Sequence, residues 1–452
     1  MRAKIDGLLH LHAESAEDER VIEHLAEKMT FVNPNWQSAH DMGASTKGLE
    51  RYSEYWVERR AHTSFPRALL PSSQWDSLSD SVVEGRTQHE ATLSLPPCWE
   101  PREGQEEAVA STVDALGVYP WGGVLQAPCG SGKTVMGLEV IRRLGVPTAV
   151  LVHKEFLVRQ WQERCEQFMP GARVGIVRLD RADTGNEYDL VICMIQSLLA
   201  RDYGQELYDS FGLVVSDEVH RLGAPKWHET IGRFSGKYRL GLTATPYRKD
   251  GLAPVFYSHI GPICHEVPAQ RLVPRLGIRR LDTTVERRAY HAAWMKKPNV
   301  GKLVTALAED ADRTVEIIRD ILKANEAGRK VLVLTARVAH VHTLVGALAA
   351  KDVDASRFIG GMKEADQEKS LESDVVVATY PMAQEGLDCP EFDTLFLATP
   401  QGDVEQAVGR ILRELPGKRD PLVVDYVDHK IGVCAGMFRA RSRVYARLGV
   451  ER

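Results

Sequence analysis

The sequence predicts an α/β protein with two tandem parallel-sheet lobes and a small accessory domain in front of them. From about residue 100 onward, short runs of apolar and β-branched residues alternate with amphipathic helical patterns. A second series of the same kind begins near residue 300. Apolar runs of this length are typical of strands buried on both faces of a parallel sheet, and their alternation with helices predicts layered α/β lobes.

The individual elements follow from these runs. The first series predicts strands within 148–154, 188–196, 211–218 and 238–245, and a helix over 155–168. The second series predicts one helix over 307–328, followed by strands within 330–337, 374–381, 394–400 and 421–428.

Three domains result from this pattern. Residues 1–92 contain a helical pattern, "EDERVIEHLAEKM", and an aromatic-rich stretch with turn signals, and we interpret them as a small N-terminal accessory domain. The proline-containing "SLPPCWEPREGQ" joins it to the first lobe, 93–270, and the second lobe is 271–452. The segment "GPICHEVPAQRLVPRLGIRR" is expected to connect the lobes. The accessory domain contains four aromatic residues that could stack on DNA bases: Trp36, Tyr52, Tyr55 and Trp56. This makes the domain a candidate DNA-binding element. The alternative is that these residues form the hydrophobic core of the domain.

The charge balance gives no sign of a polyanion partner for the chain as a whole. There are 57 Lys and Arg against 62 Asp and Glu, a net charge of −5, so any contact with nucleic acid must be local. The 7 cysteines are scattered without a C-x-x-C pair, which argues against a disulfide framework or a zinc site and favours a reducing, cytoplasmic setting. No segment reaches the roughly 18 apolar residues of a membrane helix, and the start lacks the apolar core of a signal peptide.

A glycine-rich loop follows the strand-like "GGVLQAP" and runs into a helical pattern. In such a loop the backbone N–H groups and the helix N-terminus face the phosphates of a nucleotide. Lys133 would reach the β- and γ-phosphates, and the Thr134 hydroxyl would be a ligand of Mg²⁺. The sequence therefore predicts ATP and Mg²⁺ as cofactors, with the remaining phosphate contacts from Pro128, Cys129, Gly130, Ser131 and Gly132.

Two carboxylates end a later apolar run, "FGLVVSDEVHRL". Asp217 would hold Mg²⁺ through its water shell, and Glu218 would orient and deprotonate the attacking water. Solvated surface charge at a strand end is the alternative for an isolated pair, but the upstream phosphate loop favours the catalytic interpretation.

Four segments in order, "APCGSGKT", "SDEVH", "GLTATP" and "QAVGRILRE", resemble motifs I, II, III and VI of the superfamily 2 helicases and translocases. The resemblance spans about residues 95–430. It implies two RecA-like lobes, with ATP in the cleft between them and nucleic acid lying across both.

Further residues are assigned by this resemblance. "PREGQ" is similar to the adenine-reading element, which implies a base contact for Gln105 with Arg102 nearby. Thr243 and Thr245 in "GLTATP" match the polar pair that links the ATP site to nucleic acid. "ATYPMAQEGLDCP" resembles motif V, with Gly386 and Asp388 in the matching positions.

The second lobe would supply arginines to the γ-phosphate. In "QAVGRILRE", Gln406, Arg410 and Arg413 have the spacing of one helix face. The resemblance implies that both arginines reach the ATP site, where such a charge is worth on the order of 10³–10⁵ in rate. An exposed basic helix is the alternative.

Contacts to the nucleic-acid backbone are implied for a second group of residues. "LVHKEFLVRQW" resembles motif Ia, with His153 where a proline is common, and "MIQSL" resembles a backbone-contacting element with Gln196 and Ser197. Arg248, in the triplet Arg248-Lys249-Asp250 after motif III, resembles the first residue of the R-E-D triplet of XPB-type repair helicases. The front segment resembles the N-terminal domain of UvsW-like phage and bacterial helicases, which implies a bacterial or phage-infected cell.

The predicted function is an ATP-dependent DNA helicase or translocase that unwinds or remodels duplex, forked or branched DNA. Two alternatives stay open. One is an RNA helicase, although the box reads Asp217-Glu218-Val219-His220 rather than D-E-A-D. The other is an ATPase motor subunit whose protein partner, such as a nuclease, carries the remaining chemistry.

Overall fold

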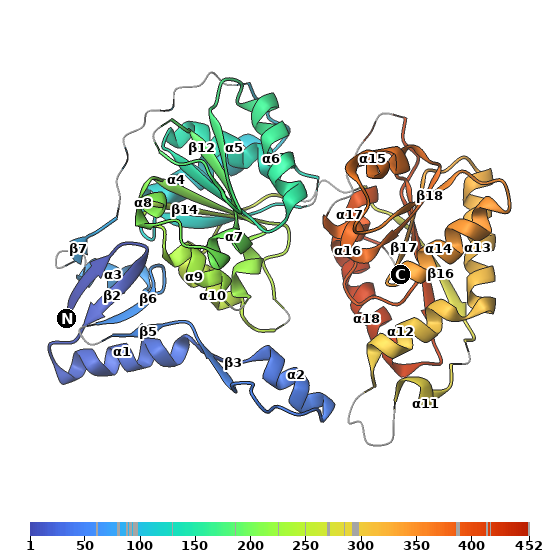
Figure 1. Ribbon diagram of the computed structural model, residues 1–452, viewed down its shortest axis with the longest axis horizontal. Coiled ribbons are helices and arrows are strands. Elements are labelled where there is room, and N and C mark those ends of the chain that lie inside the picture. Colours follow the sequence, from blue (N-terminus) through green and yellow to red (C-terminus); the bar gives the residue numbers. More distant parts are fainter. Residues whose placement is uncertain are drawn as a thin grey trace. The chain divides into compact units, whose positions relative to one another are not determined.

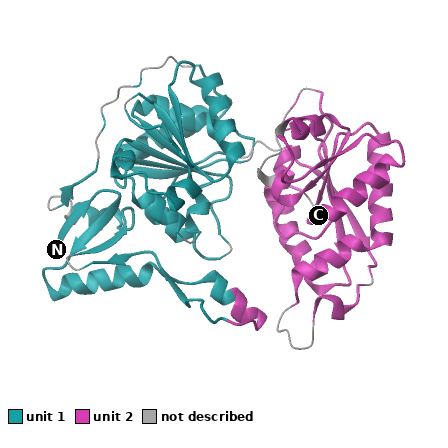
Figure 2. Cartoon of the chain, in the orientation of Figure 1, with its two compact units in different colours: residues 1–37, 46–269 teal, residues 38–45, 270–452 magenta. Residues whose placement is uncertain are grey.

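The computed structural model describes residues 1–59, 62–78, 82–86, 89, 93, 98–128, 130–185, 187–224, 226–248, 250–268, 272–283, 285–291, 298–385, 389–412, 415 and 417–450. The chain divides into two compact units, residues 1–37 with 46–269, and residues 38–45 with 270–452 (Figure 2). The predicted three-domain division at residues 92 and 270 stays a prediction.

The first 86 residues of the chain form a small α+β structure. Five strands pair in the order β5-β6-β2-β1-β7, and a two-stranded sheet, β3-β4, lies apart from them. The elements are α1 (Ala16–Lys28), α2 (Pro34–Met42), α3 (Ser72–Leu78), β1 (Arg2–Ile5), β2 (Leu8–His12), β3 (Thr30–Val32), β4 (Tyr52–Glu54), β5 (Val57–Glu58), β6 (Thr63–Pro66) and β7 (Val82–Glu84).

The rest of unit 1 is built on an eight-stranded sheet in the order β11-β10-β12-β9-β13-β14-β8-β15. All its pairings are parallel except the short β10–β11 hairpin. Its strands are β8 (Gly122–Gln126), β9 (Thr148–Val152), β10 (Val174–Arg178), β11 (Arg181–Ala182), β12 (Leu190–Met194), β13 (Leu213–Asp217), β14 (Tyr238–Thr243) and β15 (Ile263–Glu266). Its helices are α4 (Gln105–Gly117), α5 (Lys133–Leu144), α6 (Glu155–Phe168), α7 (Ile195–Ala200), α8 (Gln205–Asp209), the 3₁₀ helix η2 (Val219–Gly223), α9 (Trp227–Gly232) and α10 (Ala253–Ile260).

Helices cover both faces of this sheet (Figure 1). In β9, Val150 and Val152 belong to the core that contains α4, α5 and α6, whereas Ala149 and Leu151 belong to the core under α7, α8 and α10. Both faces of the strand are buried because successive side chains point to opposite sides. This explains the continuous apolar run from which the strand was predicted.

Unit 2 contains a six-stranded parallel sheet in the order β16-β21-β20-β17-β19-β18, with cores on both faces. Its strands are β16 (Arg275–Leu281), β17 (Val331–Thr335), β18 (Ala355–Phe358), β19 (Val375–Thr379), β20 (Thr394–Leu397) and β21 (Leu422–Asp428). Its helices are α11 (Arg287–Tyr290), α12 (Val300–Glu309), α13 (Ala311–Glu326), α14 (Val338–Ala349), α15 (Glu364–Glu372), α16 (Tyr380–Glu385), α17 (Glu405–Ile411) and α18 (Gly432–Arg447).

One expectation about secondary structure was wrong. The single helix predicted over 307–328 is two helices, because Asp310 ends α12 in an extended conformation and its side chain caps α13 by accepting from Arg313 N at 2.8 Å. The expected connection between the lobes contains β15, which pairs with β8, and β16, which pairs with β21. Both are edge strands with few fully buried side chains, so they lack the apolar run of a central strand. Within the described residues, no helix has the length and apolar character of a membrane span.

Two buried arginines attach the N-terminal part of unit 1 to the lobe. Arg67 donates to the carbonyl oxygens of Gly236 and Lys237, each at 2.7 Å. In return, Arg239 donates to Gly7 O at 2.6 Å, and both arginine side chains are fully buried. Gly7 permits this close approach, because a Cβ there would lie 2.1 Å from the carbonyl oxygen of Gly232.

We expect Arg67→Met to reduce the free energy of unfolding by about 3 kcal/mol, since one buried and one partly buried carbonyl group lose a charged donor. Chemical denaturation followed by circular dichroism measures this. The matched control is Arg20→Met on α1, where the arginine is exposed and the expected change is within about 0.5 kcal/mol. Equal stability of the two variants would show that the buried arginine is not needed for attachment.

Candidate nucleotide-binding and catalytic site

The predicted ATP-binding residues of unit 1 lie at the carboxyl ends of three adjacent strands. β13, β14 and β8 are neighbours in the sheet, and the register pairs Asp217 with Leu242 and Thr243 with Gln126. Crevices at the carboxyl ends of parallel strands are the usual ligand sites of open α/β sheets. The sheet therefore brings together segments that lie about 110 residues apart in the sequence.

The phosphate loop connects β8 to α5, and Lys133 and Thr134 begin that helix. Gly130 and Gly132 have φ values of 84° and 85°, a region that favours glycine. A Cβ on Gly132 would also lie 2.7 Å from the Gln105 amide nitrogen. The two glycines are therefore required by the conformation of the loop. Cys129, predicted as a loop contact, lies outside the described residues.

Gln105 is buried and supports the phosphate loop directly. Its Nε2 donates to Ser131 O at 2.7 Å, and its Oε1 accepts from Arg102 N at 2.8 Å. Ser131 Oγ in turn donates to Pro128 O at 2.7 Å. The structure thus places Gln105 and Arg102 beside the loop, with the amide of Gln105 bonded to loop backbone and the Arg102 side chain exposed.

The two predicted catalytic carboxylates have different surroundings. Asp217 ends β13 and accepts from Trp161 Nε1 and from Glu218 N, each at 3.0 Å. Glu218 has a φ of 49°, an uncommon conformation for glutamate that turns the chain out of the strand. Its Oε1 lies 3.9 Å from Lys133 Nζ. The loop lysine and the proposed catalytic base therefore face each other.

Burial and the neighbouring charge of Glu218 raise the pKa of Asp217 to about 6. Burial alone would also raise the pKa of Glu218, but the positive charge of Lys133 holds that pKa below its usual value. Glu218 is thus ionised at neutral pH, as a general base must be.

The residues fit a divalent cation. Carboxylate, hydroxyl and water oxygens are the ligands that Mg²⁺ prefers, and Asp217 and Thr134 supply the first two types. Oε2 of Glu218 is buried and accepts no hydrogen bond from the described residues, which leaves it available to a water molecule of the reaction.

A short chain of contacts leads from Glu218 toward Arg248. His220 Nδ1 lies 3.5 Å from Glu218 Oε2 and 3.0 Å from Thr243 Oγ1. Thr243 Oγ1 also accepts from Thr245 N at 3.1 Å. Arg248 donates to the carbonyl oxygen of His220 and pairs with Asp250. The predicted linking threonines are therefore joined to the carboxylate site through His220, whose pKa is lowered to about 4 by burial, so the ring is neutral.

In unit 2, Gln406 and Arg410 lie on α17, half-buried, and Arg410 Nε donates to Ala383 O at 3.0 Å. The helix ends at Ile411. The predictions for Arg413, Gly386 and Asp388 fall on residues outside the described part of the chain.

The chain is similar to several known proteins. The family model of the res subunit of type III restriction enzymes matches residues 99–248. A candidate ATP-dependent RNA helicase of Acanthamoeba polyphaga mimivirus is 32% identical over 314 residues, 68% of this chain. A candidate helicase of Escherichia phage T5 is 25% identical over 336 residues, 72% of this chain and 72% of that protein. These similarities support the assignment of the chain to the superfamily 2 helicases.

This chain spans 60% of the length of the mimivirus relative. Among solved structures, a fragment of a candidate HsdR subunit of a type I restriction enzyme from Vibrio vulnificus aligns with a TM-score of 0.56 and 19% identity, over 75% of this chain and 66% of that one. This likeness concerns the fold, and it confirms the predicted RecA-like lobes.

Three predicted nucleic-acid contacts of the helicase lie at the carboxyl ends of β9 and β12. His153 is buried, and burial lowers its pKa to about 4. Gln196 Nε2 donates to His153 O at 2.7 Å, and Ser197 Oγ accepts from Leu179 N at 3.0 Å. The polar groups of Gln196 and Ser197 thus connect neighbouring segments of the lobe.

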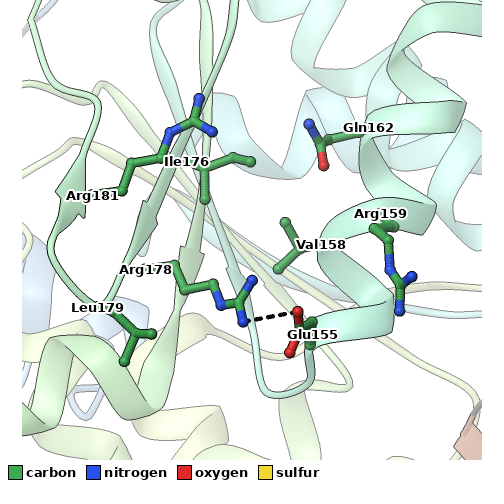
Figure 3. Close-up of a pocket in the computed structure, with 8 residues that line it drawn as sticks. All are labelled: Glu155, Val158, Arg159, Gln162, Ile176, Arg178, Leu179 and Arg181. Atoms are coloured by element: carbon green, nitrogen blue, oxygen red, sulfur yellow. Dashed lines mark ion pairs between the residues drawn. The ribbon is translucent and has the colours of Figure 1, made fainter. Parts of the chain in front are cut away.

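A pocket of about 380 Å³ lies between α6 and the β10–β11 hairpin (Figure 3). Its cationic lining residues are Arg159, Arg178 and Arg181, and Arg178 pairs with Glu155 at 2.8 Å. Sequence reasoning did not anticipate the pocket, because β10 and β11 were not predicted.

Trp161 is the site residue that sequence reasoning missed. Its position in the predicted helix, with Leu157 and Cys165 one turn away on either side, indicates only a core side chain. No local signal identifies its hydrogen bond to Asp217, since the two residues lie 56 positions apart.

Proposed function

We propose that this helicase hydrolyses ATP with Mg²⁺ to unwind or remodel duplex, forked or branched DNA. The observation that carries the proposal is the convergence of Lys133, Asp217 and Glu218 at the ends of adjacent elements, with Lys133 facing Glu218. A phosphate-binding lysine, a metal-binding carboxylate and a general base are the parts that nucleotide hydrolysis requires.

Each residue has a proposed role in turnover. Lys133 and the loop backbone bind the phosphates, and Thr134 and Asp217 would hold Mg²⁺, which when bound neutralises charge on the phosphate oxygens. Glu218 orients the attacking water and accepts its proton. Arg410 and Arg413 would stabilise the charge that develops on the γ-phosphate, and His220 with Thr243 would connect these events to bound nucleic acid.

Two observations support DNA as the substrate. The matching family model is named for a restriction enzyme, and the sequence after Asp217-Glu218 is Val-His rather than the Ala-Asp of the commonest RNA-unwinding group. The name of the mimivirus relative favours the alternative of an RNA helicase. The family model also describes a subunit, which favours a motor that works with a protein partner as a further alternative.

The steady-state ATPase rate distinguishes these functions. We expect stimulation by forked or four-way-junction DNA to exceed stimulation by single strands and by matching RNA. The stimulation should decrease strongly with salt, because phosphate contacts release counterions. The Glu218→Gln variant serves as the blank. Greater stimulation by RNA duplexes would establish an RNA helicase, and flat rates that recover when a partner protein is added would establish a motor subunit.

A further inference from the structure

The indole of Trp161 contacts the nucleotide site from a helix that carries none of the proposed catalytic groups. Trp161 lies on α6, and its Nε1 donates to Asp217 Oδ2 at 3.0 Å. The Trp161 side chain is 0% exposed and Asp217 is 8% exposed. A hydrogen bond in such a dry environment is stronger than in water, so it holds the accepting oxygen firmly.

The other oxygen of the same carboxylate is also held. Asp217 Oδ1 accepts from the backbone N–H of Glu218 at 3.0 Å. One donor on each oxygen fixes the plane of the carboxylate, and each oxygen keeps a further lone-pair direction for a water or a metal ion. The backbone donor is present for any side chain at position 218, whereas the indole donor depends on Trp161 alone.

The ring packs beside the helix that begins at the phosphate loop. A Cβ on Gly137 of α5 would lie 2.9 Å from Cδ1 of Leu242, which is too close, and 3.4 Å from Cη2 of Trp161, which is an ordinary contact distance. The edge of the indole therefore lies next to the backbone of α5 at Gly137. Trp161 thus contacts both α5, which carries Thr134, and Asp217 at the end of β13.

Other residues of α6 line the pocket shown in Figure 3, namely Glu155, Val158, Arg159 and Gln162. Val158 and Trp161 both belong to the buried core of the lobe. A movement of α6 relative to the sheet would change the Trp161–Asp217 distance directly. A displacement of α6 would therefore change the orientation of the Asp217 carboxylate through Trp161, independently of the His220–Thr243 contacts.

We propose that Trp161 is a positioning residue for the magnesium site, which orients Asp217 relative to Thr134 and the phosphate loop. The inference rests on the proposed function, because it takes Asp217 and Thr134 as the residues that hold Mg²⁺ beside ATP. Trp161 touches neither nucleotide nor metal in this role. Its effect is on metal affinity through the orientation of a ligand.

The test measures Mg²⁺ binding by the full chain in the presence of a saturating, non-hydrolysable β,γ-imido analogue of ATP. We expect Trp161→Phe to weaken Mg²⁺ binding about 10–100-fold, the usual cost of removing a hydrogen-bond partner of a metal ligand. Binding of the analogue without metal should stay unchanged. The indole N–H resonance of Trp161, one of 8 tryptophans, should shift when Mg²⁺ is added to the wild-type complex.

Two controls separate orientation from packing. Cys165→Ala removes buried volume from the same face of α6 without removing the hydrogen bond, since Cys165 is 1% exposed and one turn away. Benzothienylalanine at position 161 keeps the shape of the ring and lacks the N–H. The proposal requires that Trp161→Phe and the benzothienylalanine protein lose Mg²⁺ affinity and that Cys165→Ala does not.

Unchanged Mg²⁺ affinity in the benzothienylalanine protein would overturn the proposal. An equal loss in Cys165→Ala, or an equal loss of metal-free analogue binding, would also overturn it and assign Trp161 to packing alone. Failure of the wild-type protein to bind Mg²⁺ with the analogue would instead refute the proposed ATP site itself, so the two failures are distinguishable.

Discussion

Lys133→Ala is expected to lower kcat/KM for ATP hydrolysis by about 10³, the range seen when one preorganised electrostatic contact to a reacting group is removed. Lys133 begins α5 directly after the phosphate loop, and its Nζ lies 3.9 Å from Glu218 Oε1. Its loss removes the positive charge that would bind the phosphates. It also raises the pKa of Glu218, because the largest of the neighbouring positive charges that oppose the effect of burial is lost. Both consequences reduce the rate at neutral pH.

Initial rates of phosphate release at several ATP concentrations measure this effect. The control is Lys351→Ala, which replaces an exposed lysine of unit 2. Thermal melting of both variants establishes that they are folded. Wild-type turnover in a folded Lys133→Ala protein would rule out the proposed site.

Glu218→Gln is expected to leave ATP binding intact while lowering kcat by about 10²–10⁴, the usual contribution of general base catalysis. Glutamine keeps the size of the side chain and can still contact water, but it cannot accept a proton from it. The binding of the nucleotide depends on the loop and on Lys133, which this change leaves in place. The expected signature is therefore a large change in kcat with little change in the affinity for ATP.

Single-turnover hydrolysis and equilibrium binding of a fluorescent ATP analogue separate these two quantities. Glu229→Gln is a suitable control, because Glu229 lies on the nearby α9 and is exposed. If Glu218→Gln hydrolysed ATP at a rate close to that of the control, the base would have to be sought among other residues.

Much of the fold could be predicted because each central strand appears in the sequence as a continuous run of apolar residues. The runs around β9, β12, β13, β14, β17, β19, β20 and β21 are apolar on both faces, which is how such strands are buried. Edge strands lack this signal. β16 has only exposed and half-buried residues, so its sequence indicates a connection rather than a strand. The break at Asp310 was missed because the helical pattern continues on both sides of it.

The sequence by itself determined the segments of the ATP site, since the phosphate loop and the carboxylate pair are local patterns whose chemistry depends on neighbouring residues. Only the tertiary structure decided which distant groups support them. Gln105 bonds to the loop across 26 positions, and Trp161 bonds to Asp217 across 56. Arg67 reaches the carbonyl oxygen of Gly236 across 169. The physical reason is that a buried hydrogen-bond donor pairs with whichever buried acceptor the folded chain places beside it. Because that acceptor can lie anywhere in the sequence, the residues around the donor do not identify it.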